Sequence, residues 1–334
     1  MITIAFFNNK GGVGKTSLLY HLAWAFADFR VRVIGVDLDP QSNLSALCLE
    51  EERMEQLWGA EGAARDTVFG AIFPVKEELG DIGECHVEPV SPRFGLLPGD
   101  IHLASFEAKL SEAWPKCVDR HAPSFRATTS FHRLIDVAGR KWNADLALID
   151  VGPNLGALNR AALISAEHIV VPLGADLFSI QGLRNLGPTL AAWREEWAER
   201  AARNPVPDLN LPGGCLCPVG YVVMQPNLYG GKVTRAYDKW LARIPGEYSN
   251  AVQKSATEPT TVTSDPHCLA VLKHYRSLMP MAHEARKPIF HLQAADGALG
   301  SHAVAAREAG RDFGVLAARL AAAVGFVIPG TPPT

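Results

Sequence analysis

The sequence has no long hydrophobic run and no large excess of charge of either sign. In its 334 residues no stretch approaches the ~20 consecutive apolar residues of a membrane-spanning helix. The N-terminus lacks the basic segment, apolar stretch and cleavage site of a signal peptide. The formal net charge is only -3, so a nucleic acid or a membrane would have to bind a local patch. We therefore expect a cytoplasmic protein.

Cysteine is scarce, and the motifs of several enzyme classes are missing. The six cysteines are scattered, and only Cys215 and Cys217 lie close together. Their C-x-C spacing lacks the second pair of a zinc ribbon, and a cytoplasmic setting argues against disulfides, so we expect free, buried thiols. Neither H-E-x-x-H nor G-x-S-x-G occurs, which removes the usual basis for a zinc protease or a serine hydrolase. We expect His21 to be packed in a helix rather than catalytic.

Short apolar runs occur along the chain instead. They occupy residues 2–7, 31–36, 146–149, 169–173 and 219–224. Because these runs have no polar alternation, they predict strands that are covered on both faces, as in a parallel sheet wrapped by helices. Residues 180–203 have the pattern of one long amphipathic helix. The predicted fold class is α/β, with a doubly wound, mostly parallel sheet flanked by helices.

A glycine-rich stretch directly follows the first apolar run. Residues 8–17 read Asn-Asn-Lys-Gly-Gly-Val-Gly-Lys-Thr-Ser, and a helical pattern continues from there. Backbone N–H groups of such a turn at a helix N-terminus bind phosphates. Lys15 would then reach the β- and γ-phosphates of a nucleotide, and the Thr16 hydroxyl would bind Mg²⁺. The expected nucleotide-binding residues are Lys10, Gly11, Gly12, Val13, Gly14, Lys15, Thr16 and Ser17.

Two details depart from an ordinary phosphate-binding loop. Asn9 stands where the pattern G-x-x-x-x-G-K-[ST] has its first glycine, and Lys10 adds a second lysine. The stretch instead fits K-G-G-x-G-K-[ST], which resembles the deviant Walker A motif of the ParA/MinD family of ATPases and is most similar to ParA. Residues 36–43 and 149–156 resemble the second motif and the Walker B segment of that family, and residues 171–173 resemble its next strand.

The resemblance extends over most of residues 1–325. It implies one ParA-like ATPase domain at residues 1–328, followed by a flexible tail at residues 329–334. Two segments, residues 50–142 and 203–266, are longer than compact members of the family need. We therefore expect a P-loop ATPase with enlarged segments in a single domain.

The resemblance also implies roles for individual charged residues. Lys10 would reach across a nucleotide-sandwich homodimer to the phosphates bound by the other subunit, as an arginine finger does, so that dimerisation would require ATP. Asp39 would position the attacking water, and Asp150 would hold Mg²⁺ through a water. Asp37 would support the magnesium shell, or else cap the following turn. The implied catalytic residues are Lys10, Lys15 and Asp39, and the implied metal site comprises Thr16, Asp37, Asp39 and Asp150.

The sequence departs from the family pattern at the third motif and near the base. Gly152 replaces the first proline of the family's Asp-x-Pro-Pro segment, and we expect a difference in the stiffness of that loop. Residues 96–101 and 286–289 are only weakly similar to family segments, so adenine contacts cannot be transferred from them. Asn227, in Met-Gln-Pro-Asn, is the candidate for the adenine edge, with a turn residue as the alternative.

DNA binding would depend on a local group of basic residues. By resemblance, ParA dimers bind DNA without sequence preference, through contacts to phosphates that weaken with salt. These charges either contact DNA or form an ordinary solvated face. The candidates are Lys273, Arg276, Arg286 and Lys287, opposed locally by Glu284, with Arg184 and Arg194 on or near the predicted long helix.

We therefore predict a cytoplasmic, Mg-ATP-dependent ATPase switch of the ParA type, located at the nucleoid if it binds DNA. It would dimerise around ATP in DNA partition or cargo positioning, and a ParB-like protein or cargo adaptor would stimulate its slow hydrolysis. One alternative is an ATP-dependent small-molecule ligase or kinase on the same fold, which residues 37–41 disfavour. Another is a MinD-like or envelope-assembly regulator that binds protein or membrane. We expect no membrane binding, because the helical pattern at residues 303–324 is alanine-rich and carries charges of both signs.

Overall fold

The computed structural model describes residues 1–62, 65–224, 235–255 and 261–330. These residues form one eight-stranded sheet in the order β3-β4-β2-β5-β1-β6-β7-β8. Neighbouring strands are parallel except β3 and β4, which are antiparallel, so the predicted α/β class is confirmed. The strands are β1 (Ile2–Phe6), β2 (Val33–Asp37), β3 (Glu88–Ser91), β4 (Phe94–Leu97), β5 (Leu146–Asp150), β6 (His168–Gly174), β7 (Cys217–Met224) and β8 (Cys268–Leu272).

The five apolar runs of the sequence form most of the interior of this sheet, as β1, β2, β5, β6 and β7. Every residue of β2 and β5 is buried, because helices cover both faces, and this explains why their hydrophobicity is continuous. The sequence did not predict the hairpin β3–β4 or the edge strand β8. Gly95 interrupts the apolar residues of β4, and Val271 of β8 is exposed. These short segments therefore lack a clear hydrophobic pattern from which a strand could be predicted.

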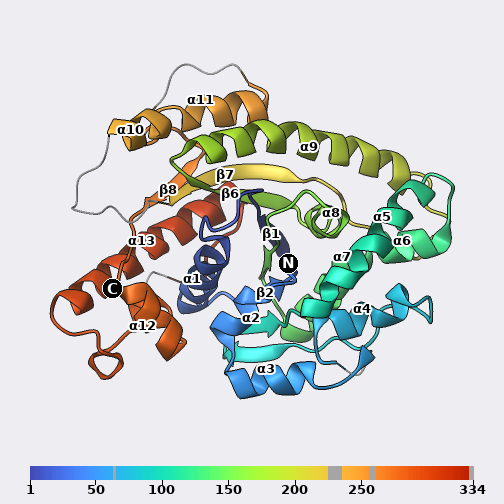
Figure 1. The fold of residues 1–334 in the computed structure, drawn as a ribbon, viewed down its shortest axis with the longest axis horizontal. Coiled ribbons are helices and arrows are strands. Elements are labelled where there is room, and N and C mark those ends of the chain that lie inside the picture. The colour runs from blue at the N-terminus through green and yellow to red at the C-terminus, as the bar shows by residue number, and fades with distance from the viewer. Residues whose placement is uncertain (63–64, 225–234, 256–260, 331–334) are drawn as a thin grey trace.

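Helices cover both faces of the sheet (Figure 1). On one face α1 (Lys15–Asp28) packs against α13 (Ser301–Ala323), and their apolar side chains share a core with β1 and β5. The other face is covered mainly by α5 (Phe106–Lys116), α7 (Ser130–Trp142), α8 (Ala157–Ile164) and α9 (Leu177–Ala201). The remaining described α-helices are α2 (Asn43–Cys48), α3 (Glu51–Trp58), α4 (Val68–Lys76), α6 (Ala122–Thr128), α10 (Arg235–Leu241), α11 (Ile244–Tyr248) and α12 (Leu278–Ala285). Short turns of helix are η2 (Ile101–Ser105), η4 (Ser249–Gln253), η5 (Ile289–His291) and η6 (Ala294–Asp296).

The two long helices predicted from the sequence are both present. The long amphipathic helix is α9, which begins three residues before the predicted start and buries Trp193 and Trp197, the latter stacked on Trp114 of α5. The C-terminal helix is α13, which buries Phe313, Leu316 and Leu320, so its apolar face is already covered within the chain. No helix of the described residues combines the length and the hydrophobicity needed to cross a membrane.

The cysteine expectation is correct in one respect and wrong in another. All six thiols are free, and Cys85, Cys117 and Cys268 are buried. Cys215 and Cys217 are exposed, because they lie where the chain crosses the surface from α9 into the start of β7. The division into one domain with enlarged segments stays a prediction, and residues 331–334 of the predicted tail lie outside the described residues.

His21 of α1 packs against α13, as expected. Its ring stacks on Phe313 with centroids 4.9 Å apart, and Nδ1 donates a hydrogen bond to the carbonyl oxygen of Ser17 at 2.7 Å. Nε2 is buried, and no described residue offers it an acceptor. A second proton would have no partner there, and burial lowers the pKa of His21 to about 4.

We expect His21 to make a contribution to the free energy of unfolding that falls as the medium is acidified. Unfolded His21 takes up a proton near the ordinary histidine pKa of 6.5, whereas the folded form does so only at about 4. This contribution is therefore lost between these two values, and it is about 2 kcal/mol smaller at roughly pH 5 than at roughly pH 7.5. Asp37 and Asp150, whose pKa values burial raises, change stability in the opposite direction, so the His21 contribution is measured as the difference between wild type and variant in chemical denaturation at the two pH values. The variant His21→Phe should remove this part of the pH dependence, and His121→Gln, at an exposed histidine, should not. Parallel pH profiles of His21→Phe and the wild type would contradict the assignment.

Candidate nucleotide-binding site

The glycine turn joins β1 to α1 at the carboxyl edge of the sheet. Gly12 and Gly14 have φ angles of 72° and 84°, in the left-handed region that favours glycine. Gly14 is the N-cap of the 14-residue helix α1 and contributes no side-chain cap to its first amides. Free amides and the helix dipole together attract anions such as phosphate. The turn therefore has the backbone geometry that phosphate binding needs.

Lys15 and the predicted aspartates meet at the ends of three adjacent strands. In the order β2-β5-β1, Asp37 pairs with Asp150, and Asp150 pairs with Phe6. Lys15 begins α1 and is only 7% exposed. Burial lowers the pKa of Lys15, and attraction by Asp150 and then Asp39 opposes this shift. One ammonium group and several carboxylates thus share a buried volume at the edge where doubly wound sheets bind ligands.

Asp150 is a buried carboxylate without a partner. It has 0% exposure, and neither of its oxygens has a hydrogen-bond partner among the described residues. Burial, followed by the negative charge of Asp37, raises the pKa of Asp150 to about 8, although the nearby Thr16 hydroxyl favours the charged form. The charged form of this carboxyl would be stabilised by a cation bound beside it.

The two possible roles weighed for Asp37 are both compatible with its geometry. Its Oδ2 accepts hydrogen bonds from Ser45 N at 2.8 Å and Ser45 Oγ at 2.7 Å, so it fastens the first turn of α2. Its Oδ1 is buried and has no partner within the described part of the chain. Burial raises the pKa of Asp37 to about 7 in spite of the Ser45 hydrogen bonds.

The residues present fit a magnesium site of the kind that nucleotides complete. No cluster of three or more His, Cys, Asp or Glu side chains in the described ranges could enclose a metal by itself. Mg²⁺ is usually held by one or two carboxylates together with substrate phosphates and waters, not by an all-protein cage. The unpaired oxygens of Asp150 and Asp37, with the Thr16 hydroxyl nearby, match that requirement.

Asp39 lies beside the loop that follows β5. It is 7% exposed, and its Oδ1 accepts a hydrogen bond from Gln41 N at 3.0 Å. A Cβ added to Gly152 would lie 3.5 Å from that same oxygen, and one added to Gly11 would lie 3.9 Å from Pro153. The loop after β5 therefore approaches both the glycine turn and Asp39.

Lys10 has a partner in its own chain. Its Nζ lies 2.6 Å from Oδ2 of Asp176, and the two side chains are 31% and 35% exposed. Asp176 also caps α9, because its Oδ1 accepts a hydrogen bond from Ser179 N. The exposed ring of Phe178 lies under the ammonium group, 5.9 Å from its centroid. The extra lysine is thus held at the rim of the site in this chain.

A cavity of about 480 Å³ opens beside the glycine turn. Gly12, Gly14 and Ser17 line one side, and the aromatic rings of Tyr275 and Phe313 line another. Such a mixture of apolar rings and polar groups suits a small organic ligand such as a nucleoside. Sequence reasoning did not place Tyr275 or its neighbours after β8 in a nucleotide site, because it did not predict that strand. Asn227, the candidate for the adenine edge, lies outside the described residues.

The comparisons with known proteins place the chain in a family. A family model described as an AAA domain matches residues 1–201, more than half of the chain. Protein IncC of Escherichia coli is 31% identical over 212 residues, which is 62% of this chain and 50% of that protein. The chromosome-partitioning ATPase Soj of Thermus thermophilus is 32% identical over 190 residues, 56% of this chain and 60% of that protein. The chain belongs to the ParA/MinD family of P-loop ATPases. It spans between half and two thirds of the length of these relatives.

Solved structures share the fold over nearly the whole chain. A crystal structure of a protein from Corynebacterium diphtheriae has a TM-score of 0.67 and 25% identity, covering 97% of this chain and 98% of that one. Apo McdA of Cyanothece has a TM-score of 0.60 and 14% identity, covering 96% of this chain and 99% of that one. The ParA-like arrangement of strands and helices therefore extends well beyond the segment matched by sequence.

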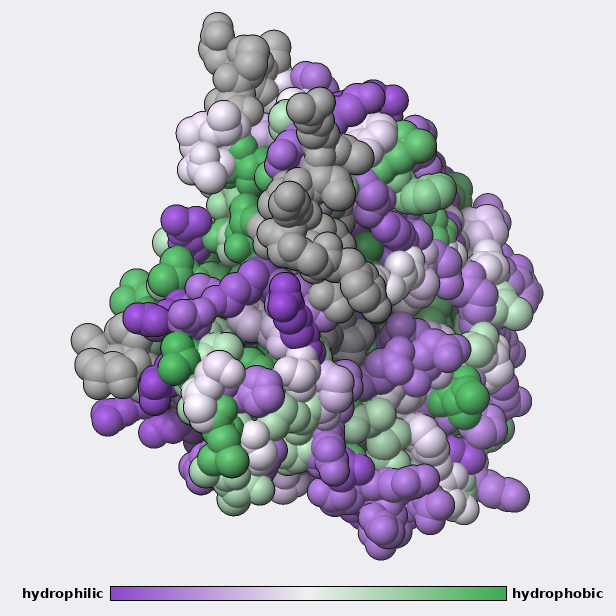
Figure 2. All heavy atoms as spheres, turned by 60° about the vertical axis from the view of Figure 1, so that its left-hand side comes forward, coloured by the Kyte–Doolittle hydropathy of each residue, from purple (hydrophilic) through white to green (hydrophobic). Residues whose placement is uncertain are grey.

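The predicted basic residues of this ParA/MinD-family protein are mostly engaged within the chain. Arg194 donates to the carbonyl oxygens of Cys215 and Leu216, while Arg276 is exposed. The ion pairs are Lys273 with Glu308, Arg286 with Glu50, Lys287 with Asp296 and Arg184 with Glu247. Figure 2 shows hydrophilic and hydrophobic residues interspersed over one face of the molecule. Carboxylates distant in the sequence thus cancel much of the positive charge counted along it.

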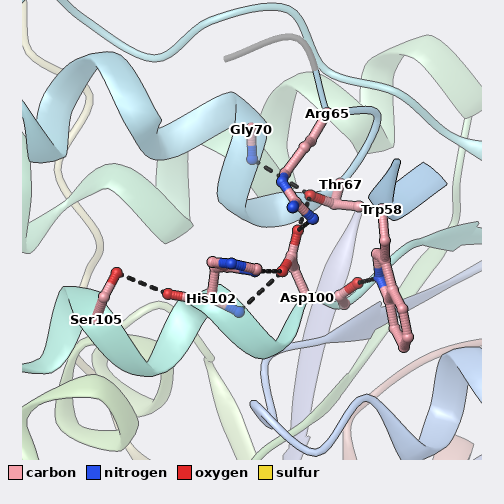
Figure 3. Close-up of polar contacts among 8 residues, drawn as sticks. Trp58, Arg65, Thr67, Gly70, Asp100, His102 and Ser105 are labelled. Atoms are coloured by element: carbon pink, nitrogen blue, oxygen red, sulfur yellow. Dashed lines mark hydrogen bonds and ion pairs between the residues drawn. The ribbon is translucent and has the colours of Figure 1, made fainter. Parts of the chain in front are cut away.

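The segment after β4 contains a buried polar cluster that the sequence did not predict (Figure 3). Asp100 has 0% exposure and accepts hydrogen bonds from Arg65 Nη1 at 3.1 Å and Thr67 Oγ1 at 3.0 Å. The preceding Gly99 donates its N–H to Ser45 Oγ at 2.8 Å. Because Ser45 also binds Asp37, this cluster connects the segment after β4 to the carboxylates of the site.

We expect Asp150→Asn to stabilise the nucleotide-free protein. The substitution removes a buried carboxyl group whose charged form is opposed by burial and by Asp37, so the free energy of unfolding should rise by about 1–3 kcal/mol. The same variant should lose the increase in Tm on addition of Mg-ATP, if the carboxylate holds the metal. Denaturation with and without Mg-ATP measures both effects, and Asp119→Asn, at an exposed aspartate, should change neither. A destabilised variant that keeps the full Mg-ATP shift would contradict this account.

Proposed function

We propose that the protein is a Mg-ATP-dependent ATPase switch of the ParA type that dimerises around bound ATP. The observation that carries the proposal is Asp150, a buried carboxylate without a partner in the described part of the chain, beside Lys15 at a phosphate-binding turn. A buried charge of this kind is costly unless a cation occupies the site. Mg²⁺ bound to a triphosphate brings that cation together with the anion that the turn attracts.

Different residues around the turn would bind different parts of the nucleotide. The amides of residues 11–15 and the Lys15 ammonium would hold the phosphates, and the base would pack against Tyr275 in the cavity. Thr16 and Asp150 would hold Mg²⁺, which draws charge from the phosphates. Asp39 would accept a hydrogen bond from the attacking water and thereby orient it.

In the proposed dimer, Lys10 of each subunit would act on the nucleotide bound by the other subunit. Four exposed apolar side chains follow strands β4, β5 and β6 at the same edge of the sheet as the site. Exposed apolar side chains gathered at one edge are typical of a surface that another protein covers. Dimerisation across this edge would bury them and bring Lys10 to the phosphates of the other subunit. These side chains are Ile101, Leu155, Leu177 and Phe178.

The cellular role that we propose is DNA partition or cargo positioning, reset by a partner that stimulates hydrolysis. The printed name of the Thermus thermophilus relative, a chromosome-partitioning ATPase, supports this choice. Nucleoid DNA is the proposed surface. It would compete with the ion pairs of Lys273, Arg286 and Lys287, so binding should be weak and strongly dependent on salt.

We expect Lys15→Ala to impair ATP binding and Lys10→Ala to impair dimerisation. Lys15→Ala removes a charge-assisted contact to phosphate, so ATP affinity should fall roughly 10- to 100-fold. Lys10→Ala should keep ATP affinity within about threefold, because the contact that it loses lies on the other subunit, but it should remain monomeric with a non-hydrolysable ATP analogue. Calorimetry gives the affinities, and light scattering gives the oligomeric state.

Asp176→Asn is the matched control for Lys10→Ala. It breaks the same ion pair from the other side, while the amide oxygen can still cap α9. This variant should form ATP-dependent dimers like the wild type. Dimers of Lys10→Ala would reject the cross-subunit role, and monomeric Asp176→Asn would show that the ion pair itself supports dimerisation.

Retardation of duplex DNA of mixed sequence should occur only with ATP and only at low salt. Binding through a few phosphate contacts weakens by about one power of ten in affinity per tenfold rise in salt for each contact. The charge-reversal variant Arg276→Glu should weaken retardation, because this basic residue is exposed. ATP-dependent dimers that show no retardation at any salt concentration would favour the alternative regulator that binds protein.

A further inference from the structure

The loop between β5 and α8 lies against the two parts of the site where hydrolysis would occur. It begins directly after Asp150, and its Pro153 and Gly152 approach the glycine turn and Asp39. Residues 153–155 are exposed, and glycines stand at positions 152 and 156. Little burial and two glycines leave this backbone few apolar restraints, so polar contacts must order it.

Glu107 fastens the far end of this loop from a different helix. The N-cap of α8 is Gly156, which has no side chain to bond the first amides. Glu107 of α5 takes that place, since its Oε1 accepts from Ala157 N at 2.6 Å and its Oε2 accepts from Leu158 N at 2.7 Å. Both oxygens of one carboxylate are thus used to fix the start of α8.

Asn159 fastens the near end of the same loop. Its side chain is 1% exposed, and its Nδ2 donates to Gly152 O at 2.9 Å and to Asn154 O at 2.7 Å. A Cβ at Gly152 would lie 3.6 Å from that nitrogen and 3.5 Å from Asp39 Oδ1. The carbonyl that Asn159 holds therefore belongs to the residue beside Asp39.

We propose that Glu107 and Asn159 are positioning residues for ATP hydrolysis, because together they hold residues 152–156 beside Asp39 and the glycine turn. The inference rests on the function proposed above. Both side chains act through the loop and not on the nucleotide. They replace, with hydrogen bonds, the restraint that a less flexible residue than Gly152 would give the backbone.

Gly156→Ala tests the contact without altering either positioning residue. A Cβ at position 156 would lie 2.7 Å from Glu107 Oε1 and 2.9 Å from Asn154 Oδ1, so the carboxylate must move away from α8 and the Asn154 side chain must shift as well. The backbone at Gly156 has φ −77° and ψ 177°, which alanine adopts readily. Gly156→Ala should therefore behave like Glu107→Ala, and the double variant should be no worse than either single variant.

The measurements are kcat at saturating Mg-ATP and the Kd for ADP. We expect kcat to fall at least tenfold in Glu107→Ala, Gly156→Ala and Asn159→Ala, with the Kd for ADP unchanged within about twofold, because the phosphate-binding turn is intact. Glu107→Gln keeps one acceptor and should recover part of kcat. Glu112→Ala is the matched control, since this glutamate of the same helix is exposed and pairs with Lys116 at the surface. Its kcat should equal that of the wild type.

The outcomes separate this inference from the proposed function. A wild-type protein without ATPase activity would overturn the proposed function and the inference with it. An active wild type with unchanged kcat in Glu107→Ala and Asn159→Ala would overturn the inference alone. Equal losses of kcat, ADP affinity and Tm in these variants would also overturn it, because they would show a general loss of structure. A double variant whose losses multiply would show that Gly156→Ala does not act through Glu107.

Discussion

The arrangement of the site depends on a buried imbalance of charge. Asp37 and Asp150 end two adjacent strands with no exposed surface, and Lys15 is the ammonium group buried with them. Burial works against the charged form of all three groups, and the attraction of Lys15 does not offset the cost. The fold tolerates this imbalance because helices on both faces of the sheet supply a large apolar core. In the proposed function, this imbalance would favour a cation carried by a phosphate.

Lys10, the extra lysine of the glycine turn, does not pair with the buried carboxylates of the site. Lys10 is paired with Asp176 at the start of α9, and not with the carboxylates around Lys15. An ion pair that is about one-third exposed is worth little, so in the proposed dimer the phosphates of the second subunit would displace Asp176 at small cost. The capping bond from Ser179 to Asp176 is independent of Lys10 and keeps α9 in place when the lysine leaves. The proposed function would thus combine a fixed helix terminus with a lysine that changes its partner.

The segments around the carboxyl edge are connected by polar contacts, not by burial alone. Asp37 binds Ser45, Ser45 binds Gly99, and the next residue after Gly99 is the fully hydrogen-bonded Asp100. A few residues later Glu107 reaches α8 and the loop beside Asp39. Loops at this edge are partly exposed, and their polar contacts add restraint to the few apolar side chains that they bury. The polar connections let three separate crossovers present their backbone to one site.

Local patterns were enough to predict the glycine turn, the interior strands of the sheet and the carboxylates at strand ends. Each of these features depends on a few neighbouring residues in the sequence, and parallel strands bring their carboxyl ends to the same edge of the sheet. The cavity beside Tyr275, the ion pair of Lys273 with Glu308 and the contact of Glu107 with α8 could not be predicted in this way. They join residues that are 35 or more positions apart, and only the packing of helices onto the sheet determines which of those residues meet.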